Sequence, residues 1–330
     1  MINITVSTNE DRQRLDRFLR KYLSAAPLSL IYKMIRKDIK VNGRRVDKEY
    51  MLAAGDVIGL YIGEERLAGL VEKKQHARTG KSIEILYEDE DILAVSKPFG
   101  LLVHGNADEK KDTLANRVID YLIETGSYVP RIERTFVPSP VHRLDRNTTG
   151  IVLFGKNAQA LRTLSVLFRE NAVRRFYTTI VAGTLTGDLH LSGSLARDES
   201  QNRSFVLKEG SLQGKRIETI ARPLYAGEKY SIAEVELITG RSHQIRAHMQ
   251  AAGYPLVCDR KYGDAAVNRA AGRKIDCHTQ LLHAGRVTLP CVPEPLPRLS
   301  GLEVTAAVPL LWKDIQIALF GKEIIPHGHE

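Results

Sequence analysis

Short apolar runs of strand length are the feature that most restricts the fold of this chain, and they dominate it after residue 82. Helical segments lie between these runs, at about 157–170 and 243–252, without the regular strand–helix–strand alternation of a parallel sheet. This mixture predicts an α+β fold, with a mixed and largely antiparallel sheet and flanking helices. The strand-like runs are SIEILYE, DILAVSK, IVLFG, RRFYTTIVAG, IETIARPLYAG and YSIAEVELITG.

Residues 1–63 predict a separate small α/β domain. Apolar residues recur at helical spacing from Leu15 to Leu23, and Ser29 can cap a second short helix. Alternating residues then lead into Asn42-Gly43, a strong hairpin signal, with Val46 on the return strand. Residues 64–81 show no sustained period and predict a linker, which leaves 82–330 for the larger domain.

Positive charge is concentrated in the small domain. Twelve lysines and arginines against four acids leave an excess of eight between residues 11 and 48, out of a net charge of +9 for the whole chain. Such a cluster favours a polyanionic partner, although a solvated basic face without a partner is the alternative. The cations expected to contact RNA are Arg14, Arg17, Lys33, Arg36, Lys37, Arg44 and Arg45.

Composition indicates a cytoplasmic protein. The chain lacks an uninterrupted apolar run of 18 residues, which argues against a membrane span, and its first residues do not resemble a signal peptide. Three widely spaced cysteines do not suggest a disulfide framework. These features fit a bacterial-type cytosol, with an organelle or another reducing compartment left open.

The segment PVHRLDRNTTGIVLFG carries the most informative chemistry. It places His142, Arg143 and Asp145 in a polar loop just before an apolar strand, with Arg146 on the other side of the carboxylate. A lone carboxylate between two cations is expected to stay ionised, which suits a nucleophile or an electrostatic stabiliser better than a general acid. A surface aspartate paired with arginine in a turn is the structural alternative.

HRLDRNTTG resembles the signature of the RluA-like family of pseudouridine synthases, which modify large-subunit ribosomal RNA. The similarity runs from about residue 83 to 307 and includes YEDEDILAVSKPFGLLVH, RRFYTTIVAG and ITGRSHQIRAHMQAAGYPLVCDRKYG. The segment in front of it resembles the alpha-L RNA-binding fold, and VNGRRVDKEYMLAAGD and LLVHGNAD favour the RluC-like branch. Thr149 and Cys258 depart from the family pattern, the latter at a position where glycine is common.

The resemblance implies roles for individual residues. Asp145 corresponds to the catalytic carboxylate, Tyr177 to the active-site tyrosine, and Arg246 to the basic residue that pairs with the aspartate. A core tyrosine and a helix-surface arginine are the structural alternatives, and Arg241 competes with Arg246. Whether Asp145 attacks the base or the sugar, or abstracts a proton, stays open.

The resemblance also implies contacts with RNA. Arg143 corresponds to the residue that fills the space left by an extruded uridine, with a phosphate contact as its alternative. His142 is expected beside it on the RNA-binding surface. The isomerisation adds no group and oxidises nothing, so neither a cofactor nor a metal is expected. Cys258, Cys277, His278, His283 and Cys291 lack metal-ligand spacing.

The sequence therefore predicts an enzyme that isomerises specific uridines to pseudouridine, most plausibly in 23S-type ribosomal RNA. A synthase of the same family that acts on transfer RNA is one alternative, and a non-catalytic RNA-binding assembly factor is another. A nucleic-acid hydrolase is disfavoured, because the paired carboxylates or metal ligands of such enzymes are not evident. The partner expected is RNA and not a membrane; the oligomeric state is open, with a monomer favoured.

Overall fold

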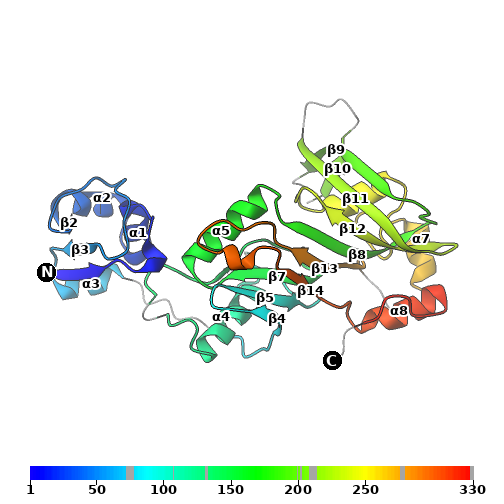
Figure 1. Ribbon diagram of the computed structural model, residues 1–330, viewed down its shortest axis with the longest axis horizontal. Coiled ribbons are helices and arrows are strands. Elements are labelled where there is room, and N and C mark those ends of the chain that lie inside the picture. The colour runs from blue at the N-terminus through cyan, green and yellow to red at the C-terminus, as the bar shows by residue number, and fades with distance from the viewer. Residues whose placement is uncertain are drawn as a thin grey trace.

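The computed structural model describes a small N-terminal unit joined to a large domain (Figure 1). It describes residues 1–330 except 72–77, 107, 131–132, 199, 201–202, 208–213, 276–278 and 328–330. Within the described residues, no helix is long and apolar enough to cross a membrane.

The N-terminal unit packs two helices on a three-stranded antiparallel sheet of order β1-β3-β2. The apolar faces of the helices supply its core, in which Leu15, Phe18 and Met34 are fully buried. Because these residues recur at helical spacing, one face of each helix is removed from water and the other is left charged. The elements are β1 (Ile2–Thr5), the 3-10 turn η1 (Thr8–Glu10), α1 (Leu15–Tyr22), α2 (Leu28–Lys37), β2 (Ile39–Val41), β3 (Val57–Leu60) and α3 (Glu64–Leu70).

Two local features of this unit differ from the prediction. Helix α2 begins at Leu28 with Pro27 as its N-cap, so Ser29 lies inside the first turn. The turn at Asn42-Gly43 is present, with φ of 50° and 76°, but its return makes a single bridge from Val41 to Arg44. Strand β2 pairs instead with β3, because that pairing buries its apolar face against the helices.

Helix α3 lies where the sequence predicted a linker. Leu67 and Leu70 pack against the core of the N-terminal unit, and the Leu70 carbonyl accepts a hydrogen bond from the Ala25 amide at 3.1 Å. Seven residues cover only two turns, which is too short for a helical period to stand out. The compact unit therefore extends to about residue 71, beyond the predicted boundary at 63.

The large domain is built on one eleven-stranded sheet, and its mixed, largely antiparallel character confirms the predicted α+β class. The order is β10-β9-β11-β12-β8-β13-β7-β5-β4, with β14 on β13 and β6 on β7; only the β13–β7 pair among these is parallel. The strands are β4 (Glu84–Glu88), β5 (Ile92–Lys97), β6 (Ser139–Pro140), β7 (Thr149–Gly155), β8 (Arg174–Ala182), β9 (Leu189–Asp198), β10 (Arg203–Val206), β11 (Lys215–Ala226), β12 (Tyr230–Leu237), β13 (Leu282–Thr288) and β14 (Glu303–Thr305).

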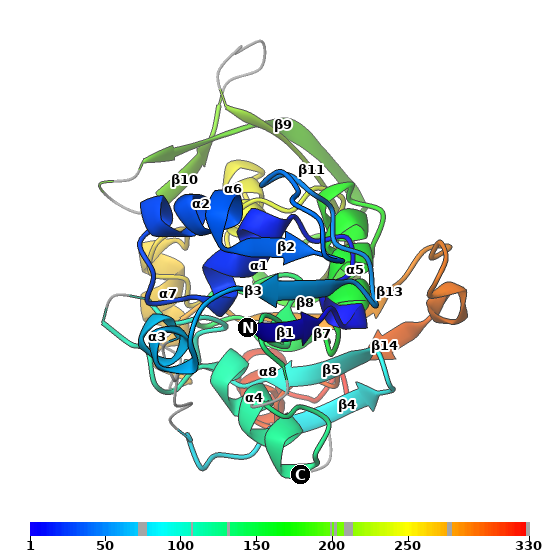
Figure 2. The same cartoon turned by 90° about the vertical axis from the view of Figure 1, so that its left-hand side faces the viewer.

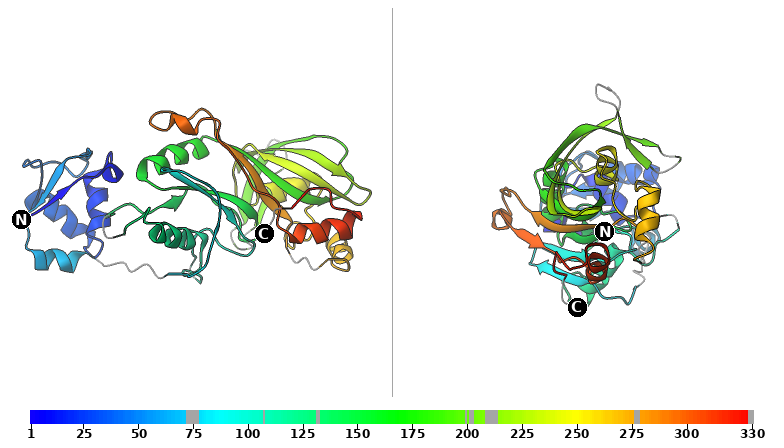
Figure 3. Two further views of the ribbon diagram at one scale, coloured as in Figure 1. Left: turned by 60° about the horizontal axis from the view of Figure 1, so that its bottom comes forward. Right: turned by 90° about the vertical axis from the view of Figure 1, so that its right-hand side faces the viewer.

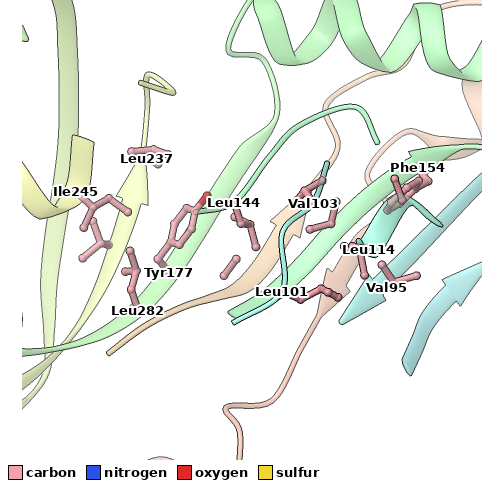
Figure 4. Packing of buried hydrophobic residues seen from close by; sticks show 14 of the residues in the cluster. Val95, Leu101, Val103, Leu114, Leu144, Phe154, Tyr177, Leu237, Ile245 and Leu282 are labelled. Atoms are coloured by element: carbon pink, nitrogen blue, oxygen red, sulfur yellow. The ribbon is translucent and has the colours of Figure 1, made fainter. Parts of the chain in front are cut away.

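Helices cover the two halves of this sheet (Figure 3). One half carries α4 and α5, and the other carries α6, α7 and α8. The main core runs across the junction of the halves, from Val95 and Leu114 to Tyr177 and Ile245 (Figure 4). The helices are α4 (Leu114–Glu124), α5 (Ala158–Arg169), α6 (Gln244–Ala251), α7 (Ala265–Ala271), the 3-10 turn η2 (Pro297–Leu299) and α8 (Leu311–Phe320).

The N-terminal unit contacts the large domain around η1 and the start of α5, and Figure 2 shows it in front of the sheet. Asn9 makes the central contact: its side-chain oxygen accepts from the Ala158 amide and its nitrogen donates to Glu133, both at 2.9 Å. The Arg134 guanidinium donates to the Thr5 carbonyl at 3.0 Å. Because Ala158 is the first residue of α5, Asn9 supplies an acceptor to a helix N-terminus that has unpaired amides.

Candidate active site

Hydrogen bonds from a buried lysine fix the loop that carries Asp145. Lys97, at the end of β5, is fully buried and its ammonium donates to the carbonyls of Pro98, Arg146 and Thr148 at 3.0, 2.7 and 2.8 Å. Burial lowers the pKa of Lys97 to about 7, and the nearby Asp145 carboxylate opposes that shift. Two of the three carbonyls belong to residues just after Asp145, so Lys97 fixes the path of this loop.

Asp145 faces Arg246, and Arg246 is itself held by a second carboxylate. The Arg246 Nη1 lies 3.4 Å from Asp145 Oδ2, while Nε and Nη2 donate to the two oxygens of Asp259 at 2.6 and 2.8 Å. Burial lowers the pKa of Arg246, but the hydrogen bonds to Asp259 together with the negative charges of Asp259 and Asp145 outweigh burial and leave this pKa raised. The guanidinium is therefore charged and oriented before any ligand enters.

Tyr177 forms part of the wall beside Asp145. It lies on β8, is 7% exposed, and packs its ring among Leu144, Leu237, Ile245 and Leu282 (Figure 4). Its hydroxyl makes no hydrogen bond with the residues that the structure describes, and burial raises its pKa to about 12. The ring thus belongs to the core, as the structural alternative supposed, while the hydroxyl is left for a ligand.

A group that the sequence analysis did not identify lies behind these residues. The Tyr262 hydroxyl accepts from the Ser204 amide at 2.7 Å and lies 2.9 Å from His243 Nδ1, to which it can donate its own proton. When it does so, His243 carries its proton on Nε2, which lies 3.8 Å from Asp145 Oδ2. The Arg246 guanidinium lies over the face of the Tyr262 ring, with its carbon Cζ 4.8 Å from the ring centroid.

The backbone around this group is unusual at two positions, and the sequence showed little sign of the group. His243 has a φ of 59°, which is uncommon for a residue with a side chain, and burial lowers its pKa. Cys258 has a φ of 64°, which explains why glycine is common at its position in the family that the chain resembles. Tyr262 stands in the quoted segment DRKYG, but its contacts with Ser204 and His243 depend on the sheet topology.

These residues open onto one strongly positive cavity of about 720 Å³. Among the described residues that line it, Asp145 is the single carboxylate. A second cavity of about 570 Å³ adjoins it and is lined in part by Arg260 and Lys261. Such a surface fits a polyanionic ligand. The arginines that line the first cavity are Arg143, Arg146, Arg169, Arg175, Arg197, Arg241 and Arg246.

The structure brings five of the predicted site residues to this cavity: His142, Arg143, Asp145, Tyr177 and Arg246. Arg143 is exposed and makes no hydrogen bond or ion pair with any described residue. His142 is instead part of the framework, because its ring stacks on Phe168 at 4.6 Å and its Nε2 accepts from the Leu153 amide at 3.2 Å. Burial lowers the pKa of His142 to about 3, so the ring is neutral and offers no charge to a phosphate.

The predicted cations of the N-terminal unit lie apart from the cavity. Arg14 is bound to both oxygens of Asp16, at 3.1 and 2.9 Å, which leaves little of its charge for a partner. Arg45 donates to the Arg36 carbonyl at 2.9 Å but remains exposed. The other five, Arg17, Lys33, Arg36, Lys37 and Arg44, are exposed.

The described residues contain no group of three or more His, Cys, Asp or Glu side chains that could hold a metal ion. Cys277 and His278 lie outside the described residues. Cys258 is buried, whereas Cys291 is exposed.

Comparison with known proteins gives a consistent result. Residues 91–251 match the family described as RNA pseudouridylate synthase. The chain is 33% identical over 315 residues to ribosomal large subunit pseudouridine synthase C of Vibrio vulnificus, which covers 88% of this chain and 90% of the relative. It is 32% identical to the protein of that name from Escherichia coli K12, with 81% of each covered. The solved structure of human RNA Pseudouridylate Synthase Domain Containing 4 covers 72% of this chain and 92% of that chain, with a TM-score of 0.54 and 21% identity, which shows the fold.

Proposed function

This chain belongs to the RNA pseudouridylate synthase family, and on that premise we propose that it isomerises uridines of large-subunit ribosomal RNA with Asp145 as the catalytic carboxylate. As a member of the family it is an enzyme that converts uridine to pseudouridine. The observation that carries the proposal is the position of Asp145, a single carboxylate in a cavity lined by seven arginines and held opposite Arg246.

The cavity suits a nucleotide turned out of its RNA helix. Arginines around the rim neutralise the phosphates, and exposed Arg143 is free to enter the space that the uridine leaves. Inside, the bond between ribose C1′ and uracil N1 breaks and a bond between C1′ and C5 forms. One proton leaves C5 and one is taken up at N1, so atoms and electrons balance within the substrate and the solvent.

The residues divide this chemistry between them. The Asp145 carboxylate attacks or deprotonates the substrate, and Arg246, fixed by Asp259, keeps it oriented. Tyr177 has a pKa of about 12, so it is a neutral phenol at physiological pH. Its role is therefore to position the uracil and to pass on the C5 proton through its hydroxyl, without prior ionisation.

We propose the domain organisation of the sequence analysis with one changed boundary. The N-terminal unit serves as an RNA-docking module through phosphate contacts, and its boundary moves from residue 63 to about residue 71 because α3 packs on its core. The large domain supplies catalysis. The cytoplasm is the proposed location, since the bacterial relatives are named for the ribosomal large subunit.

Ribosomal RNA is favoured over transfer RNA by the names of relatives that cover most of this chain. The test is release of tritium from RNA labelled at uracil C5, with transcripts of large-subunit ribosomal RNA and of transfer RNA at equal concentrations. Release from ribosomal transcripts at a kcat/KM at least tenfold above that for transfer RNA supports the proposal. Release from transfer RNA alone would overturn the ribosomal assignment and keep the activity.

A further inference from the structure

Helix α5 presents two arginines on one face, of which Arg169 lines the catalytic cavity and Arg162 does not. Arg162 and Arg169 are seven residues apart, which places them on the same side of the helix about 10 Å from each other. Both are exposed, and the helix contains no aspartate or glutamate. We call the surface formed by Arg162, Ser165 and Arg169 the α5 ridge.

The two ends of the α5 ridge meet two different parts of the molecule. At its C-terminal end, Ser165 and Arg169 line the catalytic cavity together with Arg143. At its N-terminal end, Arg162 lies close to Lys21 of α1, in the N-terminal unit. The ridge therefore joins the catalytic cavity to the N-terminal unit by the side of a single helix (Figure 1).

Lys21 and Arg162 place like charges near each other, one on α1 and the other on α5. Burial lowers the pKa of Lys21, and the positive charges of Arg162 and Arg17 lower it further. None of these three cations forms an ion pair with a residue that the structure describes. The hydrogen bonds of Asn9 to Ala158 and Glu133 hold η1, which precedes α1, against the start of α5, so the like charges on the two helices stay near each other in the fold. Such an arrangement is favourable only when an anion offsets it.

We propose that the α5 ridge binds the sugar-phosphate backbone of the RNA that flanks the target uridine and carries it from the catalytic cavity to the N-terminal unit. This inference rests on the proposed function, because the cavity at one end of the ridge must hold the uridine. RNA is favoured over an acidic protein because the ridge is continuous with that cavity, where the same strand already lies. The N-terminal unit then acts on the same RNA molecule as the catalytic centre.

Arg162→Glu is the variant that tests the ridge. The new carboxylate faces Lys21 and converts a repulsive pair into an attractive one, so thermal stability is expected to stay the same or rise. RNA binding is expected to weaken all the same. Two substrates separate the effects: a stem-loop too short to leave the cavity, and the same loop on a long helix that reaches the N-terminal unit.

On the long RNA, kcat/KM is expected to fall roughly fivefold or more through KM, and the slope of log affinity against log salt to become shallower by about one to two. On the short stem-loop the variant is expected to match the wild type within about twofold. Lys229→Glu is the matched control, because it reverses an exposed cation in the turn between β11 and β12. It is expected to leave both substrates unaffected.

Equal loss on both RNAs would overturn the proposal, since Arg162 would then act on the cavity or the fold. Unchanged kcat/KM on both RNAs would also overturn it. Unchanged RNA binding together with weakened binding of polyglutamate would overturn it too, and would assign the ridge to an acidic protein. If the wild type forms pseudouridine in neither RNA, the proposed function fails. Filter binding of the two RNAs would still decide whether the ridge contacts the backbone.

Discussion

Asp145 shares its arginine with Asp259, and the two carboxylates are held very differently. Asp259 is fully buried and takes two short bonds from Arg246, whereas Asp145 is partly exposed and takes one contact of 3.4 Å. The buried pair fixes the guanidinium, because separating it would leave an uncompensated charge at a cost of about 3–5 kcal/mol. Asp145 is thereby oriented by Arg246 while its oxygens stay available to a substrate.

Tyr262 links the two groups that face Asp145, and Tyr262→Phe tests this position. The change removes the hydroxyl that bonds to His243 Nδ1 and leaves the ring under Arg246 in place. We expect kcat to fall about tenfold with little change in KM, because one oriented hydrogen bond of about 1.4 kcal/mol is lost near the reacting carboxylate. Nitrogen chemical shifts of His243 should change from a single Nε2–H tautomer to a mixture.

Tyr128→Phe is the control for this prediction. Tyr128 is also buried, and its hydroxyl donates to the Phe136 carbonyl at 3.2 Å, away from the cavity residues. Both variants should lose about 1–3 kcal/mol of stability, since each leaves a buried group unsatisfied. An equal fall of kcat in both would mean that Tyr262 acts through stability alone.

His142 makes stability depend on pH in the acidic range. Its folded pKa is about 3 and its ordinary value 6.5, so between these values the unfolded chain binds a proton that the folded chain does not. Stability from neutral His142 is therefore complete above pH 6.5 and is lost as pH falls toward 3. His142→Gln keeps an acceptor for the Leu153 amide but does not titrate.

Urea unfolding of both proteins between pH 4 and 7 checks this. The free energy of unfolding of the wild type should rise more steeply with pH than that of the variant. The difference in slope should be at most that of one proton, about 1.4 kcal/mol per pH unit. Some acid sensitivity should persist, because burial also lowers the pKa of His248, to about 4. Parallel pH curves for the two proteins would show that His142 titrates normally in the fold.

At the scale of elements, six strands of the large domain could be predicted from their apolar runs, including the half-exposed β4 and β11, whereas β9 and β13, which glycine interrupts, were not. The runs that became β5, β7, β8 and β12 are nearly all buried, so their composition stands out. Strand β9 alternates polar and apolar residues around Gly193 and was not predicted. Helix α4 was not predicted either, although Leu114, Val118 and Leu122 recur at helical spacing.

The candidate site could also be predicted only in part. Family resemblance grouped Asp145, Tyr177 and Arg246, which lie on a loop, a strand and a helix around one cavity. Resemblance placed Lys97 in YEDEDILAVSKPFGLLVH, a segment similar to one of the family, but did not reveal its bonds to the carbonyls of the Asp145 loop. Such contacts join residues about 50 positions apart, and no local pattern encodes which strands become neighbours.

Helix α2 is the element whose charges are expected to bind RNA most directly. Lys33, Arg36 and Lys37 are exposed on it, while Ile31, Met34 and Ile35 are buried on its other face. Replacement of the three cations by glutamine should weaken RNA binding uniformly across sequences and reduce the salt slope by about two to three. Filter binding across a salt series measures this, and an unchanged slope would remove α2 from the RNA-binding surface.

At the scale of the whole molecule, the proposed function assigns catalysis to the large domain and docking to the N-terminal unit, and the described contacts between the two include those of Asn9 and Arg134. Asn9 and Arg134 hold the N-terminal unit against the large domain, and the α5 ridge joins its charges to those of the cavity. Of the net charge of +9, an excess of eight lies between residues 11 and 48, in the N-terminal unit. This arrangement lets a large RNA be positioned by its backbone while a single uridine enters the cavity.

The central claim is that Asp145 carries out the isomerisation within this RNA-binding surface. Tritium release from ribosomal transcripts labelled at uracil C5, measured together with RNA affinity for the wild type and Asp145→Asn, tests it most directly. We expect Asp145→Asn to release no tritium and to bind RNA within about threefold of the wild type, because the phosphate-binding cations are unchanged. Turnover by Asp145→Asn near the wild-type rate, or loss of RNA binding in step with activity, would contradict a catalytic role for this carboxylate.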